Sequence, residues 1–422
     1  MIKTKVLLVG PILTRSGYGE QTRFALRALR TREDIFDIFI HPLTWGQTSW
    51  IHESDDERKW IDEAIEKTVL YSQQSGQYDI SVQVTIPNEW KNLAMTNIGY
   101  TAGIEATRVH PDWISAVNGM DKVITVSNFS KDVFTSSVYQ DQNNPSYVLA
   151  AETEINVVNY PVKTHHTYQE LDLNCLRYDT NFLCVAQWGP RKNLDNTIKW
   201  FIEEFKNDEV GLVIKTNMAK NCLMDREICE GQLKSLVQQA SNGEEVKCNI
   251  VLLHGDMTDD EMHSLYKNEK IKAFVAIPHG EGYGLPIFEA AYSGLPVVSI
   301  GWSGQADYLY DLPFIDENKQ ERFYSVGFDI GLIQKEAVWD GILIKEAGWA
   351  YAREESYKEA IRQCYNDVLS NTGHVAKASE YAADLHERFK ESDVLESFIE
   401  AMGINVDEEL EWANQLSEIE IL

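Results

Sequence analysis

The chain has 422 residues, of which 66 are acidic and 38 are basic, so its formal net charge at pH 7 is −28. Single hydrophobic cores stop growing at about 250–300 residues, so this length predicts two domains. Hydrophobic residues make up 44% of the chain and charged residues 25%, which excludes a mainly disordered protein. The negative charge argues against nucleic acid or an anionic membrane as the main partner, except where a basic patch lies in a cleft.

Targeting and redox signals are absent from the sequence. The apolar run at 6–9 is too short for a signal peptide, and Gly10-Pro11 ends it. No stretch approaches the roughly 18 apolar residues that a bilayer span needs. The six cysteines form neither a CxxC pair nor a disulfide framework, so we expect reduced, buried thiols. These patterns predict a cytoplasmic protein.

The first part of the chain alternates apolar strands with amphipathic helices. In chain order we expect a strand at 6–9, a glycine-bearing loop at 16–19, a helix at 21–29, strands at 79–84 and 122–126, and a helix from about 130. Ser127 is a plausible cap for that last helix. Alternation of this kind is typical of a parallel α/β domain, which we place at 1–165.

A second series of strands and helices follows the aperiodic segment 161–180, which we interpret as a linker. Its strands are expected at 182–186, 211–215, 249–253, 273–277 and 295–300. This series defines a second domain at 181–390. The remaining 391–422 holds ten acidic residues and no Lys or Arg, which predicts a solvated helical segment. The expected fold class is therefore α/β, with two Rossmann-like, doubly wound parallel sheets that bind ligand at the carboxyl ends of their strands.

The most informative segment runs from an apolar strand through a loop into a helix. Residues 277–291 read IPHGEGYGLPIFEAA, with a proline close to the expected start of the helix. Gly282 and Gly284 permit a close backbone approach, and the free N–H groups at the helix start suit a phosphate oxygen. Glu281 and Glu289 are eight positions apart, so both could line one pocket. In so acidic a chain, that spacing alone does not define a site.

This segment resembles the EX7E signature of the retaining glycosyltransferases with the GT-B fold, especially glycosyltransferase family 4. The continuation at 290–298 is similar to the small-residue helix and strand of that family. Two further segments agree in order: 188–194 (WGPRKNL), where the family has its donor-phosphate lysine, and 253–262 (LHGDMTDDEM), which precedes the signature. Gly17 and Gly19 resemble the N-terminal glycine loop of the family.

The resemblance implies transfer of a sugar from a nucleotide-diphosphate sugar with retention of anomeric configuration. It implies that Glu281 holds hydroxyls of the donor sugar, Glu289 holds the ribose, and Lys192 neutralises the diphosphate. The N-terminal domain would bind the acceptor and the C-terminal domain the donor. The implied donor-binding residues are Gly17, Gly19, Gln187, Arg191, Lys192, Glu281, Gly282, Tyr283, Gly284, Leu285 and Glu289.

The sequence departs from the family pattern at two places. Gln187 stands where members commonly have an arginine, five positions before Lys192; either Arg191 substitutes for it or the diphosphate has one cation fewer. The segment 98–110 offers no match to the histidine that many members have near the sugar. Glu105 is our candidate for that role and joins Glu281 and Lys192 as a catalytic residue. The alternative is that Glu105 pairs with Arg108 within a helix.

Neither a metal ion nor another cofactor is expected. The chain contains no Asp-x-Asp, so the usual carboxylate clamp for a divalent cation on the diphosphate has no candidate. A different activity on the same fold, such as a nucleotide-sugar epimerase, and a catalytically silent scaffold are the alternatives. The sequence identifies neither the nucleotide and sugar of the donor nor the acceptor.

Overall fold

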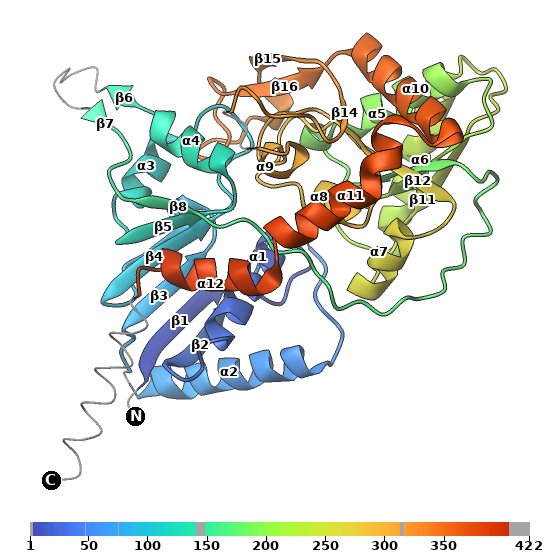
Figure 1. Ribbon diagram of the computed structural model, residues 1–422. Helices are drawn as coiled ribbons and strands as arrows, with labels where there is room; N and C mark the ends of the chain where they lie inside the picture. Colours follow the sequence, from blue (N-terminus) through green and yellow to red (C-terminus); the bar gives the residue numbers. More distant parts are fainter. Residues whose placement is uncertain (1–2, 47, 75, 141–147, 313–315, 405–422) are drawn as a thin grey trace, which may run out of the picture. The chain divides into compact units, whose positions relative to one another are not determined.

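The computed structural model describes residues 3–46, 48–74, 76–140, 148–312 and 316–404 (Figure 1). Its contacts divide the chain into two compact units. Unit 1 comprises the described parts of Met1–Ile104, Arg108–Pro161 and Glu391–Leu422, and unit 2 comprises Glu105–Thr107 and Val162–Lys390. Each unit has a parallel sheet with helices packed on it, which confirms the predicted fold class.

Unit 1 is built on a six-stranded sheet in the order β2-β1-β3-β4-β5-β8, with every pair of neighbours parallel. The strands are β1 (Thr4–Gly10), β2 (Phe36–Pro42), β3 (Ile80–Val84), β4 (Thr96–Thr101), β5 (Lys122–Thr125) and β8 (Ile155–Val157). A two-residue antiparallel pair, β6 (Tyr139–Gln140) and β7 (Val148–Leu149), lies apart from this sheet. The helices are α1 (Gly17–Arg30), α2 (Asp56–Gln73), α3 (Pro111–Val117), α4 (Asn128–Ser136) and α12 (Glu391–Ala401).

Local sequence signals start the helices of unit 1. The Ser16 hydroxyl accepts a hydrogen bond from the Gly19 N–H and caps α1. The predicted cap Ser127 is confirmed, since its hydroxyl accepts from the Ser130 N–H. α12 belongs to unit 1 because Phe398 packs edge-on against Phe24. The predicted acidic segment 391–422 is thus helical over its first eleven residues, and 405–422 lie outside the described residues.

Unit 2 has a second six-stranded sheet, in the order β11-β10-β9-β12-β13-β14, again parallel throughout. The strands are β9 (Asn181–Val185), β10 (Gly211–Lys215), β11 (Asn249–Leu253), β12 (Ile271–Ala276), β13 (Val297–Ser299) and β14 (Tyr324–Ser325). The helices are α5 (Leu194–Phe205), α6 (Leu223–Ala240), α7 (Asp259–Tyr266), α8 (Leu285–Tyr292), α9 (Ala306–Leu309), α10 (Glu354–Ser370) and α11 (Gly373–Arg388). An antiparallel hairpin joins β15 (Phe328–Leu332) to β16 (Gly348–Ala352).

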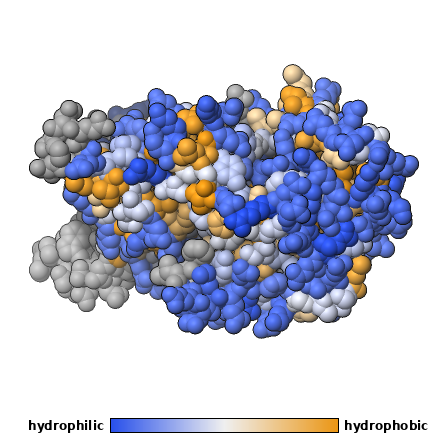
Figure 2. All heavy atoms as spheres, turned by 90° about the horizontal axis from the view of Figure 1, so that it is seen from above, coloured by the Kyte–Doolittle hydropathy of each residue, from blue (hydrophilic) through white to orange (hydrophobic). Residues whose placement is uncertain are grey.

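The five strands predicted for unit 2 are all present, but β14 to β16 there, and β2, β4 and β6 to β8 in unit 1, were not predicted. Strands buried on both faces read as continuous apolar runs, as β10 does. β4 contains Asn97 and Gly99 and shows no such run. The Trp90 ring packs directly against Gly99, so a Cβ at this position would lie 2.5 Å from the ring. On the face seen in Figure 2, hydrophilic residues dominate and apolar ones form small separate patches.

Candidate active site

The loop between β12 and α8 has the predicted strand–loop–helix geometry. β12 ends at Ala276, and α8 begins at Leu285, with Pro286 in its first turn. Gly284 precedes the helix with φ +87°, in the left-handed region that glycine tolerates best. Tyr283 is buried, with its ring 5.1 Å from that of Tyr308. Its side chain therefore belongs to the packed support of the loop.

Glu281 lies in this loop and is held by two basic side chains from the turn that follows β9. Lys192 Nζ is 2.5 Å from Glu281 Oε1, and Arg191 Nη1 is 3.0 Å from Oε2. Both cations stand in the single 3₁₀ turn Pro190–Lys192 that follows β9. β9 and β12 are parallel neighbours, so their carboxyl ends meet at one edge of the sheet. The structure thus brings together the two segments that the sequence analysis selected.

The charges of this cluster are strongly coupled. Burial alone would raise the pKa of Glu281, but Lys192 and Arg191 outweigh it and hold the pKa below its ordinary value. Burial would likewise lower the pKa of Arg191, but Glu105 and Glu281 raise it. Glu281 is therefore an ionised carboxylate at neutral pH, with a permanently charged guanidinium beside it.

Glu105 joins the same cluster. Its Oε1 lies 3.2 Å from Arg191 Nη2, and this part of the chain belongs to unit 2. The alternative of a helical pair with Arg108 is wrong, because Glu105 lies outside any helix. Arg108 instead donates to the Val138 carbonyl and lies over the Tyr139 ring.

Glu289 lies about one turn into α8, as the motif predicts. Its Oε2 accepts a hydrogen bond from the buried Tyr266 hydroxyl at 3.1 Å. Burial, followed by the charge of Glu289, raises the pKa of that hydroxyl well above its ordinary value. The tyrosine is therefore a neutral donor that fixes the orientation of the carboxylate.

The remaining predicted donor-binding residues have different surroundings. Gln187 is exposed, and its amide donates to the Met218 carbonyl. Gly17 and Gly19 form the first turn of α1 in unit 1. A Cβ at Gly19 would lie 2.1 Å from the Thr14 carbonyl oxygen, so packing already requires glycine there. No such clash exists at Gly17.

Sequence reasoning missed the loop that supports the backbone of Glu281. The Glu281 N–H donates to Ser303 Oγ at 2.9 Å, and the Gly304 N–H donates to the Glu281 carbonyl at 2.9 Å. Ser303 has φ +68°, an unusual value for a residue with a side chain. A Cβ at Gly304 would lie 1.9 Å from the Gly282 carbonyl oxygen. The pattern Gly-x-x-Gly at 301–304, directly after a strand, is the signal that could have identified this loop.

His279 has a structural place beside the site. Its Nδ1 lies 2.7 Å from the Ala350 carbonyl oxygen, so this nitrogen carries the proton. Its backbone N–H donates to the Arg191 carbonyl at 2.7 Å. Burial lowers the pKa of the ring, which keeps it neutral. The residue therefore connects the loop between β12 and α8 to the turn that holds Lys192 and to β16.

One group of three side chains among the described residues has the spacing of metal ligands: Asp225, Cys229 and His254. The Asp225 carboxylate, however, already accepts hydrogen bonds from three backbone N–H groups, at 218–220. His254 Nε2 lies 2.8 Å from Asp225 Oδ1, and the Cys229 thiol lies 3.6 Å from the same oxygen. With its acceptor positions filled, the carboxylate joins β11 to α6 and does not fit a cation.

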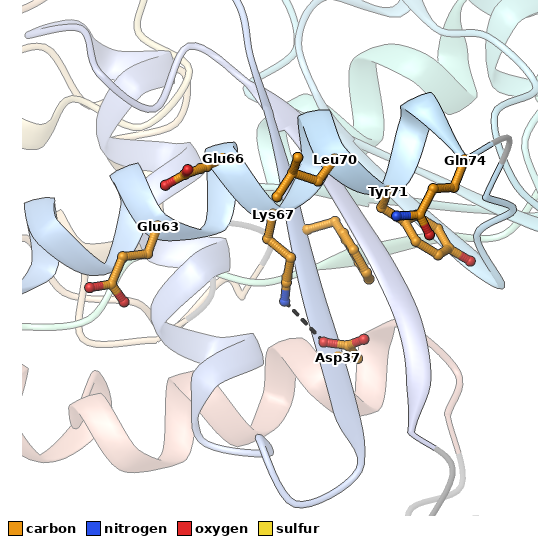
Figure 3. Close-up of a pocket in the computed structure, with 8 residues that line it drawn as sticks. Asp37, Glu63, Glu66, Lys67, Leu70, Tyr71 and Gln74 are labelled. Carbon is orange, nitrogen blue, oxygen red and sulfur yellow. Dashed lines mark hydrogen bonds and ion pairs between the residues drawn. The ribbon is translucent and has the colours of Figure 1, made fainter.

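Unit 1 has a surface pocket between β2 and α2 (Figure 3). Lys67 reaches across it to Asp37 at 2.9 Å and lies over the Phe39 ring. Leu70, Tyr71, Gln74 and two glutamates complete the lining. The pocket contains an internally paired cation and none of the predicted site residues.

Comparisons with known proteins find a family match within unit 2 and solved structures of similar fold. Residues 178–323 match the family Glycosyl transferases group 1. The chain is similar in structure to a glycosyltransferase from Rickettsia africae, with 13% identity, a TM-score of 0.60 and coverage of 95% of this chain and 98% of that one. It is also similar to Anabaena HepE in complex with UDP and glucose, with 12% identity and a TM-score of 0.58. That similarity covers 95% of this chain and 99% of HepE.

The match and these structural similarities identify residues 178–323 as a glycosyltransferase domain and the fold as GT-B. TarM from S. aureus, at 14% identity and a TM-score of 0.47, covers 77% of this chain, and the chain spans 55% of the TarM length. Comparison with curated protein sequences gives no match. Among the described residues, no helix combines the length and apolar character required to span a membrane.

Proposed function

We propose that the chain is a retaining glycosyltransferase, similar to family 4, that moves a sugar from a nucleotide-diphosphate sugar to an acceptor. The observation that carries this proposal is the cluster that Glu281, in the loop before α8, forms with Lys192 and Arg191. It combines an ionised carboxylate, which can accept hydrogen bonds from sugar hydroxyls, with cations and a helix N-terminus, which favour a diphosphate.

The chemistry follows from where charge develops. When the bond between the anomeric carbon and the diphosphate oxygen breaks, negative charge grows on the departing diphosphate. The ammonium of Lys192 and the N–H groups at the start of α8 would stabilise that charge. Glu281 would orient the sugar, and Glu289, fixed by Tyr266, would bind the ribose. Donor contacts of Gly17, Gly19 and Gln187, and an acceptor site in unit 1, stay predictions.

We further propose that the reaction needs no metal ion. The support is the sequence, which lacks an Asp-x-Asp clamp, together with the Lys192 ammonium placed beside Glu281. Transfer should therefore persist in EDTA. Activity that EDTA abolishes and Mn²⁺ restores would contradict this part of the proposal.

The test of the main proposal is a thermal-shift screen with uridine, guanosine and adenosine diphosphates, followed by assays of donor hydrolysis and transfer with the matching sugars. We expect one diphosphate to stabilise the protein, and the anomeric proton of the product to show retention by NMR. Binding without hydrolysis or transfer would favour the silent scaffold. Interconversion of the donor sugar without transfer would favour an epimerase.

A further inference from the structure

The placement of Glu105 is determined by its backbone as well as by its carboxylate. The Thr107 N–H donates to the Gly348 carbonyl at 3.0 Å, and the Gly348 N–H donates to Thr107 Oγ1 at 2.7 Å. A Cβ at Gly280 would lie 2.5 Å from the Glu105 carbonyl oxygen, so glycine there lets the two backbones touch. The segment 105–107 is thus packed against the loop between β12 and α8 and hydrogen-bonded to β16.

The Arg191 guanidinium is held by several contacts. Its Nη1 donates to the Gly280 carbonyl at 2.7 Å and to Glu281 Oε2 at 3.0 Å, while its Nη2 faces Glu105 Oε1. Its own carbonyl accepts from the His279 N–H. A planar guanidinium bound in this way has a fixed orientation. Lys192, with a flexible stem, pairs with Glu281 Oε1 among the described residues.

We propose that Glu105 is a positioning residue, which acts through Arg191 to hold the Glu281 carboxylate in place. This inference rests on the proposed function of the same site. The four side chains are two bases and two carboxyl groups. A diphosphate then has to draw only the Lys192 ammonium away from Glu281, because Arg191 and Glu105 keep the carboxylate oriented.

This role differs in its consequences from a direct contact between Glu105 and the sugar. Glu105→Gln adds one unit of positive charge near the diphosphate, and Arg191→Gln removes one. Both loosen Glu281, so both should lower kcat by about 10–100-fold, the scale of a small misplacement of a reacting group. Their effects on Kd for the nucleoside diphosphate should be opposite in sign and smaller than about fivefold.

The experiment is a double-mutant cycle of Glu105→Gln and Arg191→Gln, compared with Lys192→Ala. The matched control is Asp329→Asn, which removes an exposed carboxylate from its pair with Arg353 in the same unit. Each protein is titrated by calorimetry with the nucleoside diphosphate that stabilises the wild type, then assayed for kcat and KM with the corresponding donor. Thermal unfolding of the four cycle members, without ligand, measures the coupling of the pair independently.

The expected result is a double variant with a kcat no lower than that of either single variant and with Kd restored toward the wild-type value. Lys192→Ala alone should lose more than about tenfold in affinity. Multiplied losses of kcat, or a loss of affinity in Arg191→Gln as large as that in Lys192→Ala, would overturn the proposal. If the wild type binds no diphosphate, the proposed function fails. The positioning role is then decided by thermal unfolding, where strictly additive losses would overturn it.

Discussion

Lys192 Nζ lies 2.5 Å from Glu281 Oε1, although 89 positions separate the two residues in the chain. The contact exists because β9 and β12 are adjacent and parallel, so the turns that follow them meet. The ammonium faces one oxygen of the carboxylate, and the guanidinium of Arg191 faces the other. A bound diphosphate would compete for the ammonium, and the carboxylate would keep its second partner.

Lys192→Ala should weaken binding of the nucleoside diphosphate by about 10–100-fold, because a charge-assisted contact is lost. The difference in affinity between wild type and variant should shrink as ionic strength rises, since salt screens the attraction between the Lys192 ammonium and the diphosphate. Isothermal titration at two salt concentrations checks both points. Lys199→Ala, on the exposed surface of α5, is the control and should bind as the wild type does. Equal affinities for the two variants would contradict the diphosphate role.

Glu281→Gln should abolish most of the transfer activity. The neutral amide no longer balances the charges of Lys192 and Arg191, and its NH2 group points a hydrogen-bond donor at one of these two donors. The same change should lower the free energy of unfolding by about 1–3 kcal/mol at neutral pH, since a partner of buried charges is lost. Denaturant unfolding and a transfer assay measure the two effects separately. A variant with wild-type turnover would remove the central claim of the proposed function.

The pH dependence of that stability difference has a definite sign. The folded pKa of Glu281 lies below the ordinary value of 4.5, so the unfolded state binds the proton more readily. The stabilisation is therefore complete above pH 4.5 and is lost as the pH falls through the folded pKa. The difference between wild type and Glu281→Gln should be constant from pH 6 to 8 and should narrow in acid. A difference that widens below pH 4.5 would contradict this reasoning.

The sequence was sufficient for the parts of the site that local patterns encode. Glu281 and Lys192 each follow an apolar strand at a glycine-bearing turn, so their places could be predicted from spacing and from the family resemblance. Ser303 could not be found in this way, because it contacts the Glu281 N–H from a separate loop whose backbone has φ +68°. Glu105 was selected, but its pairing with Arg191 depends on how 105–107 packs against Gly280 and Gly348.

Gly280→Ala tests whether that packing matters. The added Cβ would meet backbone atoms of Glu105 at 2.5 and 3.1 Å, which cannot move as a flexible side chain can. We expect a loss of about 1–3 kcal/mol in unfolding free energy and a lower kcat. Gly231→Ala, on α6 with no atom within 4 Å of the added Cβ, is the control and should not reduce either quantity. Wild-type kcat in Gly280→Ala would show that the position of 105–107 is irrelevant to the reaction.

Asp225→Asn tests the conclusion that the Asp225, Cys229 and His254 cluster is structural. The amide retains one acceptor oxygen, whereas the carboxylate accepts from three backbone N–H groups and lies within hydrogen-bond distance of His254. At least one buried donor loses its partner, so stability should fall by about 2–3 kcal/mol at pH 7. Glu230→Gln, a change of a half-buried side chain on the same helix that removes its pairs with Arg226 and Lys234, should cost less than about 1 kcal/mol.

The pH and metal dependence of Asp225→Asn separate a structural carboxylate from a metal ligand. The backbone N–H groups and His254 outweigh burial and hold the pKa of Asp225 well below its ordinary value of 3.8, so its stabilisation persists through neutral pH and is lost only in strong acid. Urea unfolding of wild type and variant should therefore differ equally at pH 7.5 and 8.5, and less at pH 2. EDTA should leave the Tm of the wild type unchanged. A Tm that falls in EDTA and recovers with Zn²⁺ would mean that the cluster binds a cation, because the hydrogen bonds that fill the carboxylate need no metal to form.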